Sequence, residues 1–194
     1  AVATPDGQLY TAGDASTLFS IQSISKVFTL TIGLGKLGDG LWTHVGREPS
    51  GDPFNSIVML EHETGRPRNP FINAGAIAVV DAIMMGHKPK ETLGEILQFV
   101  HLIADDESIR FDHKVAASEM AHKDRNASLA HFMKSFGRLK HEVDNVLGTY
   151  FHQCSIAMNC QQLASAGLYL VSNGVDKHSG VRVINEHRAR RINS

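Results

Sequence analysis

Apolar residues recur along most of the chain at the spacing of amphipathic helices. The first helical run extends from Ile24 to Leu34, and glycines weaken its later turns until Gly40 ends it. The same pattern predicts helices over residues 73–85, 91–104, 112–122, 124–136, 142–153 and 159–172, and a basic segment at 186–194 begins another. Helices therefore dominate the predicted fold.

Strands are predicted at few places. The opening segment AVATPDGQLYTAGDA indicates a β-hairpin that turns at Pro5–Gly7. Residues 43–70 are rich in glycine and proline and too long for a plain connection, so we expect a binding loop there. Asp124 suits the N-cap of a helix, and Gly137 and Gly174 suit helix ends. Any substantial sheet must be completed by residues outside this chain.

The length and composition fit one domain. The chain has 194 residues, and a hydrophobic content of 42% is enough for a proper core. The first hairpin strand is too short to stand alone, and the final basic helix stops at Ser194 without a cap. We therefore expect residues 1–194 to be a partial domain that lacks N-terminal and C-terminal segments.

Charge and cysteine content exclude several classes of protein. A net charge of −1 gives no general attraction to nucleic acid or to an anionic membrane, and no segment resembles a signal peptide or a membrane span. Cys154 and Cys160 have the spacing of neither a CxxC redox pair nor a zinc knuckle, so we expect reduced thiols in a cytoplasmic protein. The eleven histidines are scattered outside HExxH spacing, which predicts no metal site.

One short motif carries candidate chemistry. Ser23 and Lys26 form SxxK at the start of the first helical run, so their side chains lie on one face about one turn apart. Such a lysine activates the serine only if an apolar site keeps the amine uncharged. The motif alone is weak, because a chain of this length contains about one SxxK by chance. A surface lysine on an ordinary core helix is the alternative.

Five segments together are far more specific. They are FSIQSISKVFTL, VGREPSGDPFNS, RNPFINAGAI, SEMAHKDRNASLA and YFHQCSIAMNC. Their order and spacing resemble those of the bacterial-type glutaminases over essentially the whole chain. That family belongs to the β-lactamase and penicillin-binding-protein group of serine hydrolases. The resemblance implies an α+β fold, in which a helical cluster packs on an antiparallel sheet that is largely missing from this chain.

The resemblance also implies roles for six residues. Ser23 matches the nucleophile, Lys26 matches the group that activates it, and Tyr150 belongs to the same pocket and to the catalytic set. The substrate-contacting positions are Ser23, Asn73, Glu119, Asn126 and Tyr150. The implied substrate is L-glutamine, with no metal or organic cofactor, and family members tend to form homodimers or homotetramers. A later pocket tyrosine and a glycine-rich segment of the family lie outside this chain, so we expect the isolated chain to be inactive or very weak.

The chemistry of these residue types agrees with glutamine binding. Glu119 supplies a negative charge for the α-ammonium group, and Asn73 and Asn126 can donate to the carboxylate or the amide. The phenol of Tyr150 can donate to a carboxylate or assist proton transfer to ammonia. Each residue also has an ordinary structural interpretation. Glu119 could be a solvated helix residue, Asn126 a first-turn polar residue, Asn73 a helix cap and Tyr150 an aromatic at the edge of the core.

Two other functions stay open at this point. Another SxxK serine hydrolase, such as a β-lactamase, a D,D-peptidase or an esterase, would react with a chromogenic β-lactam and ignore glutamine. A non-catalytic amino-acid-binding module would keep the pocket without the reaction. The pair of Glu119 and Asn126 favours a zwitterionic amino acid over a penicillin. GxSxG and GxxxxGK[ST] are absent, which argues against an α/β-hydrolase or a P-loop enzyme.

Overall fold

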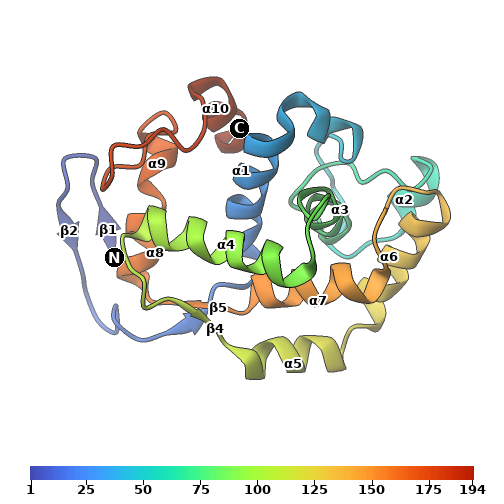
Figure 1. The fold of residues 1–194 in the computed structure, drawn as a ribbon, viewed down its shortest axis with the longest axis horizontal. Helices are drawn as coiled ribbons and strands as arrows, with labels where there is room; N and C mark the ends of the chain where they lie inside the picture. The colour runs from blue at the N-terminus through green and yellow to red at the C-terminus, as the bar shows by residue number, and fades with distance from the viewer.

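The structure is a computed structural model that describes residues 1–194, and helices make up most of it (Figure 1). The helices are α1 (Ser25–Leu37), α2 (Val58–His62), α3 (Asn73–Ile83), α4 (Pro89–Ala104), α5 (His113–Ala121), α6 (Asp124–Ser135), α7 (Val143–Cys154), α8 (Cys160–Ala166), α9 (Leu168–Val171) and α10 (Glu186–Asn193). Two 3-10 helices, η1 (Gln22–Ile24) and η2 (Gly38–Thr43), flank α1. No helix is long and apolar enough to cross a membrane.

The strands form two small antiparallel sheets. β1 (Val2–Ala3) pairs with β2 (Leu9–Tyr10), which confirms the predicted hairpin, and β1 contacts α8. A second sheet joins β3 (Phe19–Ser20), β5 (Ile156–Met158) and β4 (Arg110–Phe111) in the order β3-β5-β4. β3 of the second sheet comes directly before η1, so the sheet fixes the direction of the chain segment that leads to Ser23.

Helix α1 lies at the centre of the molecule, and α3, α4, α7 and α10 pack against it (Figure 1). Its apolar residues, such as Leu34, belong to one buried cluster that extends to α4 and α10. A second cluster joins α3, α6 and α7 through residues such as Ile77 and Leu147. Each fully buried side chain of this size stabilises the fold by about 1.5–3 kcal/mol. The two clusters hold rigidly the helices that carry the candidate site residues.

Most predicted helices are confirmed, and several boundaries are wrong. α1 ends before Gly38, which takes a φ of 57°, so Gly40 lies inside η2 instead of ending the helix. Asp124 is the first residue of α6, and Lys123 occupies the N-cap without a side-chain cap bond. The predicted helix at 159–172 is divided at Gly167 into α8 and α9. Polar side chains do cap three other helices, at Asp112, Asn159 and Asn185.

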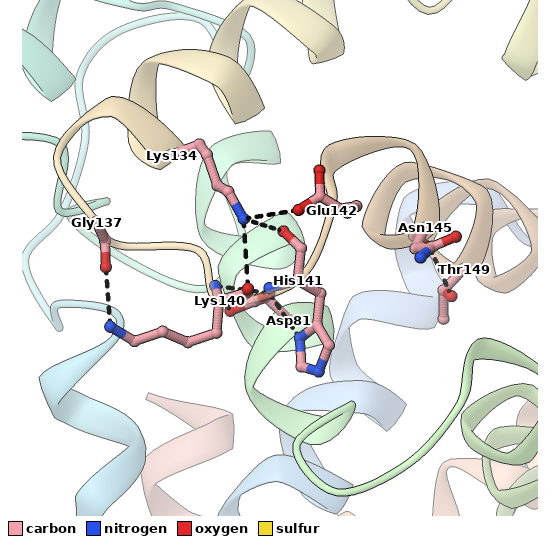
Figure 2. A network of polar contacts seen from close by, with 8 residues as sticks. All are labelled: Asp81, Lys134, Gly137, Lys140, His141, Glu142, Asn145 and Thr149. Carbon is pink, nitrogen blue, oxygen red and sulfur yellow. Dashed lines mark hydrogen bonds and ion pairs between the residues drawn. The ribbon is translucent and has the colours of Figure 1, made fainter.

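A buried carboxylate anchors the connection between α6 and α7 (Figure 2). Asp81, on the last turns of α3, is fully buried and accepts hydrogen bonds from the backbone N–H groups of Lys140 and His141 and from His141 Nδ1. Lys134 Nζ donates to the carbonyl of His141 at 2.8 Å and lies 3.6 Å from a carboxylate oxygen of Glu142. The network fixes the start of α7 against α3.

Candidate active site

Ser23 lies on a sharp turn between β3 and α1. The N–H of Ile21 bonds to the carbonyl of Ile156 on β5, so the turn starts from a strand held in the sheet. Gln22 then adopts a φ of 48°, a left-handed conformation that is uncommon for residues other than glycine, asparagine and aspartate. After this turn the Ser23 side chain is exposed, whereas Lys26 in the first turn of α1 is buried.

Lys26 is the most informative residue of the site. Its exposed fraction is only 2%, and its Nζ donates to the carbonyl of Phe71 at 2.9 Å and to Asn73 Oδ1 at 2.8 Å. The ring of Phe54 lies 5.7 Å from the same nitrogen. Burial lowers the pKa of Lys26 below its ordinary value, because the charged form loses its hydration. No hydrogen bond joins Lys26 Nζ to Ser23 in this structure.

Asn73 connects the lysine to a second asparagine. It is the first residue of α3 and makes no side-chain cap bond, so the interpretation as a helix cap is wrong. Its Oδ1 accepts from Lys26, and its Nδ2 donates to Asn126 Oδ1 at 3.1 Å. Gly75 makes this placement possible, because a Cβ there would lie 1.8 Å from the backbone oxygen of Asn69. The start of α3 therefore packs directly on the chain that precedes it.

Glu119 and Asn126 lie on either side of a break between two helices. Glu119 is near the end of α5, Asn126 is in the first turn of α6, and both side chains are partly buried. Glu119 Oε1 accepts a hydrogen bond from Gln22 Nε2 at 3.3 Å. The carboxylate thus adjoins the residue before Ser23, and Asn126 adjoins Asn73. Sequence reasoning missed Gln22.

Tyr150 lies on α7 and is 3% exposed. Burial raises the pKa of its phenol well above the ordinary range, and the neighbouring Cys154 thiol and Glu119 carboxylate act in the same direction. Burial also raises the pKa of the Cys154 thiol to about 11, although Tyr150, Lys26 and Ser25 act against this shift. At neutral pH the phenol is therefore a hydrogen-bond donor and the thiol is inert.

The structure joins three of the six predicted residues by hydrogen bonds and places a fourth, Glu119, against Gln22, whereas no hydrogen bond joins Ser23 or Tyr150 to these residues. One hydrogen-bonded chain joins Lys26, Asn73 and Asn126, and a second contact joins Gln22 to Glu119. The predicted site residues line none of four cavities of about 280, 360, 450 and 590 Å³ elsewhere in the molecule. No group of three or more His, Cys, Asp or Glu residues is placed to hold a metal ion. The arrangement combines an exposed hydroxyl, a buried amine, a carboxylate and two amides.

Comparison with known proteins identifies the family. The family model described as Glutaminase matches residues 1–194. The chain belongs to the glutaminase family. It is 83% identical to the glutaminase of Psychrobacter cryohalolentis and 60% identical to the thermolabile glutaminase of Rhizobium etli, over all 194 residues in each case. These alignments cover 63% of each relative, so the chain spans less than two thirds of these glutaminases.

Solved glutaminase structures share the fold. The probable glutaminase of Bacillus subtilis has a TM-score of 0.92 at 32% identity, covering 98% of this chain and 61% of its own. A protein called Mglu, solved in its L-glutamate binding form, has a TM-score of 0.90 at 37% identity, covering 98% of this chain and 43% of its own. The expected family and the α+β, β-lactamase-like fold class are both confirmed.

Proposed function

We propose that the protein hydrolyses L-glutamine to L-glutamate and ammonia through an acyl-enzyme formed on Ser23. Membership of the glutaminase family supports the substrate and the reaction. We further propose that residues 1–194 form the greater part of one glutaminase domain, because longer relatives align with the chain along its whole length. The observation that supports the mechanism best is the environment of Lys26.

The contacts of Lys26 suit an uncharged amine. A neutral amine has two N–H donors and one lone pair, whereas an ammonium has three donors and no lone pair. The structure offers two acceptors to this nitrogen, the carbonyl of Phe71 and the side-chain oxygen of Asn73. With both N–H groups engaged, the lone pair of Lys26 stays available for the proton of Ser23. The lowered pKa of Lys26 acts in the same direction, because it favours the uncharged form.

The remaining side chains suit a zwitterionic amino acid. Glu119 would bind the α-ammonium group, with its carboxylate oriented by the amide of Gln22. Asn126 and Asn73 would donate to the substrate carboxylate or to its side-chain amide. Tyr150 stays protonated because its pKa is raised, so its phenol can donate a hydrogen bond or a proton.

The reaction proceeds in two displacements. Lys26 takes the proton from Ser23, whose oxygen attacks the side-chain carboxamide carbon. The C–N bond then breaks, and the nitrogen leaves as ammonia after receiving a proton from the protonated Lys26 or from Tyr150. Water attacks the resulting γ-glutamyl ester and loses a proton to the group that protonated ammonia, Lys26 or Tyr150. The C–O bond to Ser23 then breaks as the Ser23 oxygen regains a proton from Lys26, and glutamate is released. No metal or organic cofactor takes part in any of these steps.

Two substitutions in a full-length glutaminase that contains these 194 residues test the mechanism. Ser23→Ala and Lys26→Met should each lower kcat for ammonia release from L-glutamine by at least about 1,000-fold. Ser23→Ala should still bind glutamate, as measured by calorimetry, because the other four substrate-contacting side chains are intact. Normal turnover by Ser23→Ala would rule out the acyl-enzyme. Acylation by a chromogenic β-lactam without glutamine turnover would instead indicate another SxxK hydrolase.

We propose three further properties of the protein. We infer that the 194 residues alone are inactive or very weak, which an ammonia assay on the isolated chain tests. A cytoplasmic location is supported by Cys154 and Cys160, which are unpaired thiols. Assembly into homodimers or homotetramers follows from the family resemblance, and light scattering on the full-length protein tests it.

A further inference from the structure

The turn before Ser23 is held in an unfavourable backbone conformation. Four residues other than glycine have a positive φ, and Gln22, at 48°, is the one that directly precedes the proposed nucleophile. A left-handed conformation is costly for a side chain with a Cβ, so it persists only where surrounding contacts determine it. The contacts that hold Gln22 therefore bear on where Ser23 points.

Two side-chain hydrogen bonds in series reach the Gln22 carbonyl from the core, and the backbone N–H of Ser25 donates to the same oxygen. Ser25 Oγ donates to this carbonyl oxygen at 2.6 Å, and Gln153 Nε2 donates to Ser25 Oγ at 3.2 Å. Ser25 begins α1 and Gln153 lies near the end of α7, and both are 0% exposed. The single proton of Ser25 goes to a carbonyl, which can only accept, so the nitrogen of the Gln153 amide must face the hydroxyl.

Gln153 is a costly residue for this position. Its other amide atom, Oε1, is buried and has no hydrogen-bond partner. An unsatisfied buried acceptor destabilises the fold, whereas an apolar side chain of the same shape would avoid this cost. A buried polar residue with an unpaired acceptor departs from the rule that buried polar atoms are hydrogen-bonded, which indicates that it serves a purpose other than stability. The one hydrogen bond that the Gln153 side chain makes is the bond to Ser25.

The held carbonyl also fixes the direction of a backbone N–H. No peptide bond in the chain is cis, so the C=O of Gln22 and the N–H of Ser23 point in opposite directions across one peptide plane. Because the carbonyl is directed at the buried hydroxyl of Ser25, the N–H of Ser23 is directed away from it. A fixed N–H beside the nucleophile is the kind of donor that stabilises a developing oxyanion.

We propose that Ser25 and Gln153 are positioning residues that hold the Gln22–Ser23 peptide for catalysis. They touch no substrate; they act through the orientation of the Ser23 hydroxyl and N–H. They also connect α7, the helix that carries Tyr150, to the nucleophile turn. This inference rests on the proposed role of Ser23 as the nucleophile.

The test uses a full-length glutaminase that contains these residues, with kcat and KM for L-glutamine measured separately. Ser25→Ala and Gln153→Met should each lower kcat by about 10- to 100-fold, less than the loss of an entire oxyanion donor, and change KM by less than about threefold. Ser25→Thr keeps the hydroxyl and should restore most of kcat. Thr31→Val is the matched control, because it removes another buried hydroxyl of α1 that donates to a backbone carbonyl. It should leave kcat unchanged.

The double variant separates positioning from general damage. Ser25 and Gln153 act in series, so Ser25→Ala with Gln153→Met should lose no more kcat than Ser25→Ala alone. Three results would overturn the proposal. The losses of kcat in the two single variants could multiply in the double variant, or Ser25→Thr could fail to restore kcat. The third such result is a kcat within about threefold of wild type in both single variants. Ser23→Ala distinguishes failure of the proposed function from failure of the positioning role. If it keeps normal turnover the proposed function fails, whereas if it abolishes turnover and the single variants are normal, only the positioning role fails.

Discussion

The buried carboxylate of Asp81 offers the sharpest prediction about stability. Asp81 receives hydrogen bonds from two backbone N–H groups and one imidazole, at 2.9 Å for the shortest contact of each donor. All three donors belong to Lys140 and His141, in the connection that leads into α7 (Figure 2). Asp81→Ala removes every acceptor at once and leaves three partly buried donors without their partner.

The size of the loss follows from these contacts. Hydrogen bonds to a charged group contribute about 1.5–3 kcal/mol each, but the three share one carboxylate and do not add fully. Removing one partner of a buried charged network typically costs about 3–5 kcal/mol, and we expect that range for Asp81→Ala. Asp81→Asn keeps one acceptor oxygen and should lose less, about 2–3 kcal/mol.

Thermal unfolding of the full-length glutaminase that contains these residues measures the effect. At about 2–4 °C per kcal/mol, Asp81→Ala should lower Tm by at least about 6 °C. Asp144→Asn is the matched control, because its carboxylate is 77% exposed in an ion pair with Lys123 and should contribute less than about 1 kcal/mol. Equal Tm values for the Asp81→Ala and Asp144→Asn variants would refute the reasoning.

Three other predictions concern the site and its surroundings. Gly75→Ala places a Cβ 1.8 Å from a backbone oxygen and should lower kcat/KM at least about tenfold, because α3 must shift. Gly94→Ala meets nothing within 4 Å and should stabilise α4 by up to about 1 kcal/mol. Measurements of kcat/KM and Tm for both variants check these expectations. The kcat/KM profile should rise with pH as Lys26 loses its proton, with a midpoint below the ordinary 10.5, and a flat profile or a midpoint at 10.5 would contradict the role of Lys26. Maleimide at neutral pH should label Cys160 well before Cys154, whose thiol is buried and has a pKa raised to about 11, and mass spectrometry of the labelled peptides decides the order.

The sequence predicts helices better than it predicts where they end. A long apolar period such as that of α4 is compatible only with a helix, so its presence follows from the pattern alone. Helix ends depend on single residues, and several glycines near the end of α1 could each serve; the structure uses Gly38. β3 and β4 have two residues each and leave no alternating pattern, because their pairing is with β5, far away in the chain.

The sequence predicts only part of the candidate site. Lys26, Asn73 and Asn126 follow from motifs, and the structure joins them by hydrogen bonds. Gln22 carries no comparable signal, because a positive φ is typical of glycine, asparagine and aspartate and not of glutamine. Its partner Glu119 lies 97 positions away, so only the folded chain reveals the contact.

The acyl-enzyme itself is the most direct test of the mechanism. A full-length glutaminase that contains these residues is mixed with L-glutamine, quenched in acid during turnover and digested for peptide mass spectrometry. A glutamyl group attached through an ester should be found on Ser23 and should be absent from the Ser23→Ala variant. A glutamyl group on a different residue would contradict a mechanism in which buried, neutral Lys26 activates Ser23. The same holds if Ser23 is found unmodified during turnover while deacylation limits the rate.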